Sequence, residues 1–130
     1  MIDRNSLRRP TDAELSILRA LWHNGPGTVR QVQEILNRQR PTGYTTVLKL
    51  LQIMIEKGLV ERDEAQRTHV YRARLSRSET QRQLVGDLLD KAFGGSASQL
   101  VIQALSSKRA SAEELAQIRQ IIDQMEGDSE

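Results

Sequence analysis

The sequence contains no cysteine, and this absence removes several kinds of chemistry at once. Disulfides, thiolate metal sites and cysteine nucleophiles are all excluded. Aromatic residues are also scarce, with one Trp, two Tyr and one Phe among 130 residues, so Leu, Ile and Val have to build the core. A chain of this length predicts one modest core, or a small head followed by an accessory segment.

Long apolar runs are missing as well. No stretch approaches the roughly 18 to 20 apolar residues that a helix needs to cross a bilayer, so we expect no membrane insertion. The first ten residues, MIDRNSLRRP, are charged and have no apolar segment behind them, which is unlike a signal peptide. These absences predict a soluble, cytoplasmic protein.

What the sequence does contain is an uneven distribution of charge. Residues 1–75 carry 13 Arg and Lys residues against 8 Asp and Glu, a net charge of +5. Residues 76–130 carry 6 against 9, a net charge of −3. A basic front half suits a polyanionic partner, and an acidic rear half suits a different task.

Capping boxes predict the first turns of five helices. In each box a Ser or Thr is followed three residues later by Glu or Gln, so that the two side chains satisfy each other's backbone N–H groups. The boxes are Thr11–Glu14, Thr28–Gln31, Ser76–Glu79, Ser96–Gln99 and Ser111–Glu114, and an apolar helical period follows each of them. A sixth helix is expected after residues 41–43, and Gly25, Gly58 and Gly94 stand where helices should end.

The apolar period changes between Gly58 and Ser76. Residues 59–62 and 69–75 alternate in polarity and carry β-branched or aromatic side chains, with a polar connection at 63–67, which predicts a β-hairpin. Three helices followed by a hairpin, in a basic segment, is the order of a winged helix-turn-helix domain. The predicted fold is therefore mostly α with a small β-hairpin: a winged helix-turn-helix head over residues 1–75 and a three-helix dimerisation segment over residues 76–130.

The rear segment carries more apolar side chains than three short helices can bury within one chain. The last of its apolar stripes is spaced like the seam between two helices, so pairing of two copies is the simplest way to cover it. The residues predicted to dimerise are Leu84, Leu88, Leu100, Leu105, Leu115, Ile118, Ile122 and Met125.

The third helix carries the functional hypothesis. Its predicted core face consists of Val47, Leu50, Leu51 and Met54, which leaves a polar face on the opposite side. A helix-turn-helix places the start of its second helix against base edges in the major groove. The hydroxyls and the cation at the start of this helix fit that task, and the candidate DNA-binding residues are Tyr44, Thr45, Thr46 and Lys49. A polar stripe taken alone is more often a merely solvated helix face.

Three separated segments resemble the penicillinase-repressor family (BlaI/MecI/CopY). Residues 44–60, YTTVLKLLQIMIEKGLV, are similar to that family's recognition helix and the start of its wing. Residues 10–22 are similar to its first helix, and residues 93–101 resemble its dimerisation region. The resemblance covers about residues 10 to 126, with the motifs in the same order and spacing.

The resemblance implies a repressor whose homodimer binds an inverted-repeat operator in double-stranded DNA. It places Arg67, Thr68 and His69 of the wing near the phosphates. Several members are inactivated when a membrane metalloprotease sensor triggers their cleavage. Where the β-lactam branch has its cleaved Asn-Phe bond, this chain has Gln103 and Ala104, so its cleavage specificity would differ. The cysteine pairs of the copper-responsive branch are absent, which excludes copper sensing by that route.

Other functions find less support in the sequence. There is no nucleophile elbow with a histidine partner, so no enzyme is expected. His23 and His69 lie on different predicted elements, so we expect no metal and no cofactor. The main alternative is a winged-helix module that binds protein rather than DNA, which would need an apolar recognition face. Leu48, predicted to be exposed, is a small indication of such a face.

Overall fold

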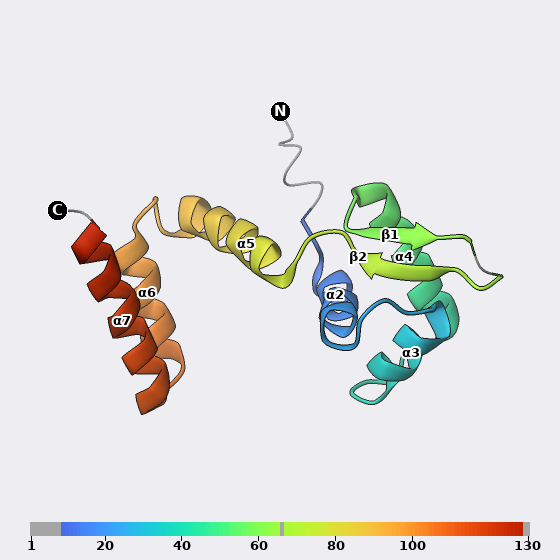
Figure 1. Ribbon diagram of the computed structural model, residues 1–130, viewed down its shortest axis with the longest axis horizontal. Helices are drawn as coiled ribbons and strands as arrows, with labels where there is room; N and C mark the ends of the chain where they lie inside the picture. Colours follow the sequence, from blue (N-terminus) through green and yellow to red (C-terminus); the bar gives the residue numbers. More distant parts are fainter. Residues whose placement is uncertain (1–8, 66, 129–130) are drawn as a thin grey trace. The chain divides into compact units, whose positions relative to one another are not determined.

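The computed structural model describes residues 9–65 and 67–128. Within these residues it contains six helices and one two-stranded antiparallel sheet (Figure 1). The helices are α2 (Asp12–Asn24), α3 (Val29–Asn37), α4 (Tyr44–Lys57), α5 (Arg77–Ala92), α6 (Ala97–Ser107) and α7 (Ala112–Asp128), and the strands are β1 (Val60–Asp63) and β2 (Val70–Ala73). The predicted fold class, mostly helical with a small hairpin, is confirmed.

The helices begin where the capping boxes predict. The Thr11 and Thr28 hydroxyls accept hydrogen bonds from the backbone N–H groups of Glu14 and Gln31. In return, the Glu14 and Gln31 side chains accept hydrogen bonds from the backbone N–H groups of Thr11 and Thr28. The Ser76, Ser96 and Ser111 hydroxyls accept equivalent bonds at the starts of α5, α6 and α7. Each of these boundaries therefore has a local hydrogen-bonding cause.

The chain divides into two compact units, the first extending to Leu84 and the second beginning at Val85. This division lies within α5, nine residues beyond the boundary predicted from the sequence. Two contacts account for the difference. The Trp22 indole N–H donates to the Leu75 carbonyl at 3.0 Å, and Thr80 in the first turn of α5 is buried. The start of α5 therefore belongs to the first unit, while the assignment of dimerisation to residues 76–130 stays a prediction.

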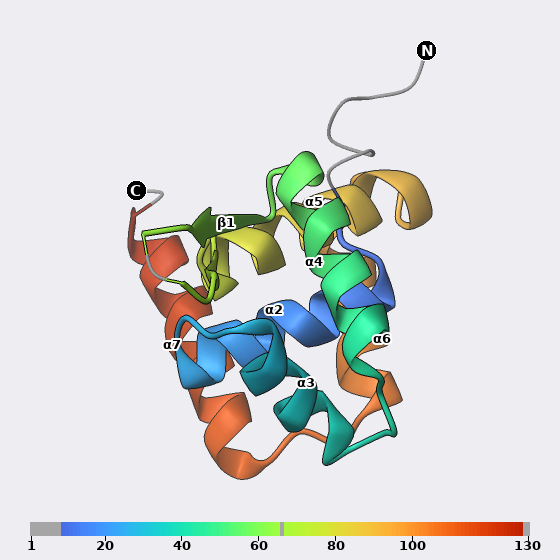
Figure 2. The ribbon, with the colours of Figure 1, turned by 90° about the vertical axis from the view of Figure 1, so that its right-hand side faces the viewer.

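Helices α2, α3 and α4 surround the core of the first unit (Figure 2). The buried apolar residues are Ile17, Leu18, Leu21, Val29, Val32, Val47, Leu51, Met54, Leu59, Val60 and Tyr71. Leu50 is half-buried at the edge of this core. The sequence predicts an exposed Leu48, but that residue is half-buried and packs against the core. The prediction of its exposure is therefore wrong, and it no longer supports the apolar recognition face that a protein-binding module would need.

The hairpin is attached to the helices through its second strand. In the sheet, Glu61 pairs with Arg72 and Arg62 with Tyr71. Gly27, between α2 and α3, exchanges two backbone hydrogen bonds with Tyr71, of 2.9 and 2.8 Å. Because the Tyr71 side chain is also buried in the core, the base of the hairpin is anchored on both sides and only its loop projects.

An ion pair joins the start of α2 to the end of α4. The Lys57 ammonium donates to Glu14 Oε1 at 2.6 Å, and the Glu14 side chain is only 2 % exposed. Burial acts to raise the pKa of Glu14, but hydrogen bonds from Lys57 and from the Thr11 backbone N–H outweigh it, and the pKa lies below its ordinary value. Glu14 is thus both a cap for α2 and a tether for α4.

Replacing Lys57 by Met should destabilise the first unit. The change leaves the buried Glu14 carboxylate without its cation, and we expect the free energy of unfolding to fall by about 3 kcal/mol, the lower end for breaking a buried pair, since Lys57 itself is partly exposed. Chemical denaturation measures this decrease, with Lys49→Met as the control on an exposed part of the same helix.

The same pair predicts a pH dependence. Because folding lowers the pKa of Glu14, its contribution is fully present above the ordinary carboxyl pKa and disappears as the pH falls through the folded value. In Glu14→Gln, the free energy of unfolding should therefore fall less steeply as the pH is lowered. An equally steep fall in that variant would show that the pair contributes nothing.

The second unit leaves much of its apolar surface uncovered. No side chain of α6 or α7, both described in full, is buried. The two helices overlap in Figure 1 but lie apart in Figure 2. The exposed large apolar residues on them are Val101, Ile102, Leu105, Leu115, Ile121, Ile122 and Met125. None of the described helices is long and apolar enough to cross a membrane.

Candidate nucleic-acid interface

The start of α4 presents four of the predicted DNA-binding residues to solvent. Tyr44, Thr45, Thr46 and Lys49 are all exposed, while Val47 between them is fully buried and fixes the rotation of the helix. The side chains therefore project from a rigid, core-anchored element. A surface of two hydroxyls, a phenol and an ammonium can donate hydrogen bonds to phosphates and to base edges.

The turn before α4 is fixed by hydrogen bonds around Thr42. The Asn37 carboxamide oxygen accepts from the Thr42 N–H at 3.0 Å, and the Gln33 amide donates to the Thr42 carbonyl at 2.9 Å. Both partners belong to α3, so α3 holds the entrance to α4 in place. This is the relation of positioning helix and recognition helix in a helix-turn-helix.

The N-terminus of α4 has no side-chain cap. Its N-cap residue is Gly43, and no side-chain hydrogen bond closes the first turn, in contrast to α2 and α3. The first N–H groups of a helix, together with its dipole, favour an anion. The helix that carries the predicted recognition residues therefore has its first-turn N–H groups available to a phosphate.

Arg30, in the first turn of α3, is not among the residues predicted from the sequence. Its guanidinium carbon lies 5.8 Å from the centre of the Tyr44 ring, within the range of a cation–π contact. The contact joins the starts of α3 and α4 and brings a cation beside the recognition residues. The sequence does contain an indication of its role, because a cation at a helix N-terminus is unfavourable with respect to the helix dipole and suggests that the charge serves another purpose. The contact with Tyr44 could be found only in the structure.

The wing residues Arg67, Thr68 and His69 lie exposed in the loop between β1 and β2. The structure does not gather them with the start of α4: the hairpin loop and the turn before α4 project from different places on the first unit (Figure 1). Two separate contact points are what a winged helix uses to hold a duplex, one in the groove and one on the backbone.

Two carboxylates of the wing, Glu61 in β1 and Glu64 in the loop after it, are paired with arginines. Glu61 forms an ion pair with Arg72 at 2.8 Å, and Glu64 forms one with Arg62. Hydrogen bonds with Tyr71 and with Glu64 keep the pKa of the Arg62 guanidinium above its ordinary value. Pairing lowers the repulsion that these carboxylates would exert on a phosphate, and it leaves Arg67 as the cation of the loop itself.

The remaining predicted residues are distributed as follows. Leu84 is half-buried and belongs to the first unit, while Leu100 and Ile118 are half-buried in the second. Leu88, Leu105, Leu115, Ile122 and Met125 are exposed. Gln103 and Ala104 lie exposed in the middle of α6. His23 and His69 lie on α2 and in the wing loop, and among the described residues no three His, Cys, Asp or Glu side chains gather as metal ligands would.

Comparison with known proteins agrees with this arrangement. The family model described as "Penicillinase repressor" matches residues 10–124. The chain is 32% identical over 121 residues to the transcriptional regulator BlaI of Mycobacterium tuberculosis, covering 92% of this chain and 87% of that protein. It is 22% identical over 114 residues to the penicillinase repressor of Bacillus licheniformis, covering 88% and 89%.

A solved structure supports the fold. One chain in a complex of hsRosR superimposes with a TM-score of 0.51 at 18% identity, covering 98% of this chain and all of that one. The predictions of a winged helix and of the family are both confirmed. This chain belongs to the penicillinase repressor family of transcription regulators, which are not enzymes.

Proposed function

We propose that the chain is a cytoplasmic repressor that binds, as a homodimer, an operator of two-fold symmetry in double-stranded DNA. Membership of the family makes it a regulator of transcription. The symmetric operator, the dimer and the contacting residues are the parts that we propose.

The observation that carries the proposal is the exposed, uncapped start of α4. Thr45, Thr46 and Lys49 project beside one another from a helix whose opposite face is the core of the unit. Hydroxyls and an ammonium read base edges in the major groove, and free N–H groups bind the adjacent phosphate. With Leu48 packed inward, this face favours DNA over an apolar protein partner.

The proposed dimer rests on the uncovered apolar faces of α6 and α7. Met125 is 67% exposed and Ile102 is 57% exposed, and each side chain that becomes fully buried stabilises by roughly 1.5–3 kcal/mol. A second copy of the chain offers the same faces and so can cover them symmetrically.

A membrane metalloprotease sensor remains part of the proposal as a regulatory partner. The bond between Gln103 and Ala104 lies within the helical backbone of α6, which continues to Ser107. A protease binds its substrate in an extended form, so α6 would have to unwind before cleavage at this bond.

Selection from genomic DNA tests the proposed function directly. The protein is incubated with fragmented DNA from its own organism, and the retained fragments are sequenced. We expect enrichment of a short inverted repeat whose half-sites lie about one helical turn apart or slightly more. Retention without any shared sequence would contradict operator binding.

Substitutions then separate base reading from phosphate contact. Lys49→Ala or Thr46→Ala should weaken binding to the enriched site by about 1–3 kcal/mol, with a smaller effect on random DNA. Arg67→Ala should weaken both alike, since a phosphate contact carries no sequence information. Fluorescence anisotropy on both duplexes measures the difference, and equal weakening on both for Thr46→Ala would reassign that residue to positioning.

A further inference from the structure

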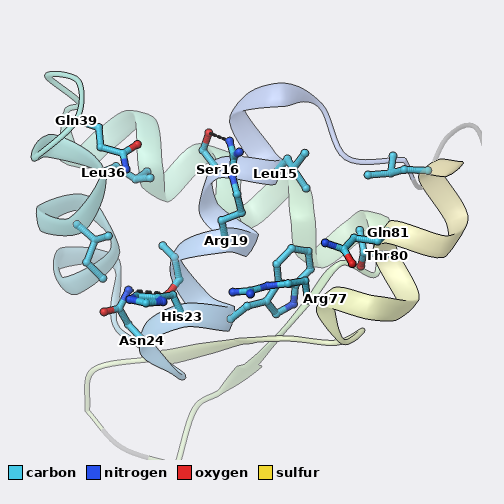
Figure 3. Close-up of a pocket in the computed structure, with 14 residues that line it drawn as sticks. Leu15, Ser16, Arg19, His23, Asn24, Leu36, Gln39, Arg77, Thr80 and Gln81 are labelled. Atoms are coloured by element: carbon cyan, nitrogen blue, oxygen red, sulfur yellow. Dashed lines mark hydrogen bonds between the residues drawn. The ribbon is translucent and has the colours of Figure 1, made fainter. Parts of the chain in front are cut away.

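A cavity of about 650 Å³ lies in the first unit, and none of the residues that line it belongs to α4 (Figure 3). Its walls come from one face each of α2, α3 and the first turns of α5. On α2 the face runs through Leu15, Arg19 and Trp22, and on α5 it runs through Arg77, Thr80 and Leu84. The volume is within the range of about 300–1,000 Å³ that holds small ligands.

The apolar part of the wall comes from all three helices. Leu15 of α2, Leu36 of α3 and Leu84 of α5 are each only half-buried, although they line the cavity. Their exposed apolar surface faces a hollow rather than packed protein. An apolar ligand body would remove that surface from water.

The charged part of the wall is cationic. Arg19 and Arg77 line the cavity together with His23, and no Asp or Glu of the described residues does. In Figure 3, Arg77 extends from α5 toward the side where His23 lies. The guanidinium of Arg19 donates to the Ser16 hydroxyl at 3.3 Å, and neither arginine forms an ion pair with a described residue.

We propose that this cavity binds a small organic carboxylate with an apolar body. The planar guanidinium fork matches a carboxylate with two parallel hydrogen bonds, so Arg77 would hold the head group, and Arg19, whose guanidinium lies beside Ser16 in Figure 3, would add positive charge to the wall. The leucines and Trp22 would cover the body. Such a ligand would contact α2, α3 and α5 at once.

The position of Trp22 makes the test direct, because it is the only tryptophan of the chain and lines the cavity. The full-length protein, without DNA, is titrated with sodium octanoate and separately with octanamide, which has the same body but no charge. We expect a saturable change of tryptophan emission with octanoate, and binding at least about ten-fold weaker with the amide.

Variants and methyl NMR locate the binding. Arg77→Gln should weaken octanoate binding by about ten-fold or more, and Arg19→Gln, which removes a second cation from the wall without removing a contact to the head group, should weaken it by a smaller factor. Arg82→Gln is the matched control, since Arg82 is exposed on the same helix and does not line the cavity. Methyl signals of Leu15, Leu36 and Leu84 should shift, whereas those of Leu105 and Leu115 in the second unit should not.

Several outcomes would overturn the proposal. These are equal binding of octanoate and octanamide, binding unchanged by both arginine substitutions, and shifts confined to the exposed leucines of α6 and α7. Circular dichroism checks that the variants are folded. Because none of these measurements involves DNA, they stand or fall separately from the proposed repressor function.

Discussion

Replacing Ile118 by Asp in α7 is expected to convert the dimer to a monomer and to weaken operator binding by about 100-fold or more. Ile118 lies on the apolar stripe of α7 that also contains Leu115, Ile122 and Met125, three residues that are exposed in the single chain. An unpaired carboxylate in a dimer interface has to be desolvated without compensation. Once the two heads separate, the second half-site contact is no longer intramolecular, and it ceases to contribute to avidity.

Sedimentation equilibrium measures the first effect and anisotropy on the operator measures the second. Gln120→Asp is the matched control, because it places the same charge on the opposite side of α7. A dimer that survives Ile118→Asp with unchanged operator affinity would mean that the interface lies elsewhere, in the first unit.

Raising the salt concentration from 50 to 200 mM is expected to weaken operator binding by about 10³-fold. The front half of each chain has a net charge of +5, and a dimer that neutralises about six phosphates releases their counterions, so the logarithm of the affinity falls linearly with the logarithm of the salt concentration. The exposed cations Arg30 on α3, Lys49 on α4 and Arg67 in the wing loop are the expected sources of these contacts.

Arg67→Gln provides the internal comparison for this titration. The substitution removes one cation per half-site, so the slope should become shallower by about one for each phosphate that is no longer neutralised. An affinity independent of salt would exclude phosphate-led binding, whatever the sequence preference.

The order of elements could be predicted from the sequence because its signals are local. A Ser or Thr with its partner three residues later needs only the first turn of the helix, and Thr11, Thr28, Ser76, Ser96 and Ser111 all act as predicted. Gly25 and Gly58 end helices with φ angles of 86° and 78°, which an L side chain rarely adopts. The exposure of the residues at the start of α4 could also be predicted locally, because a buried Val47 directs the neighbouring side chains toward solvent.

Contacts between elements distant in the sequence were decided by tertiary structure alone. The sequence predicts Glu14 as a helix cap, but its ion pair with Lys57 joins residues 43 positions apart. Leu48 is half-buried because it packs against the core, a contact that its neighbours in sequence do not indicate. No period in the sequence indicates which element packs against a given face.

The cavity shows the same division between local and distant information. Arg19 stands on α2 and Arg77 on α5, and nothing in the residues around either one relates it to the other. They come to line one hollow because the start of α5 packs against α2, with Thr80 buried and the Trp22 indole bonded to Leu75. The sequence by itself determined the helices, their caps and the family. The packing of those helices decided which side chains meet, because burial depends on the whole chain rather than on its neighbours in sequence.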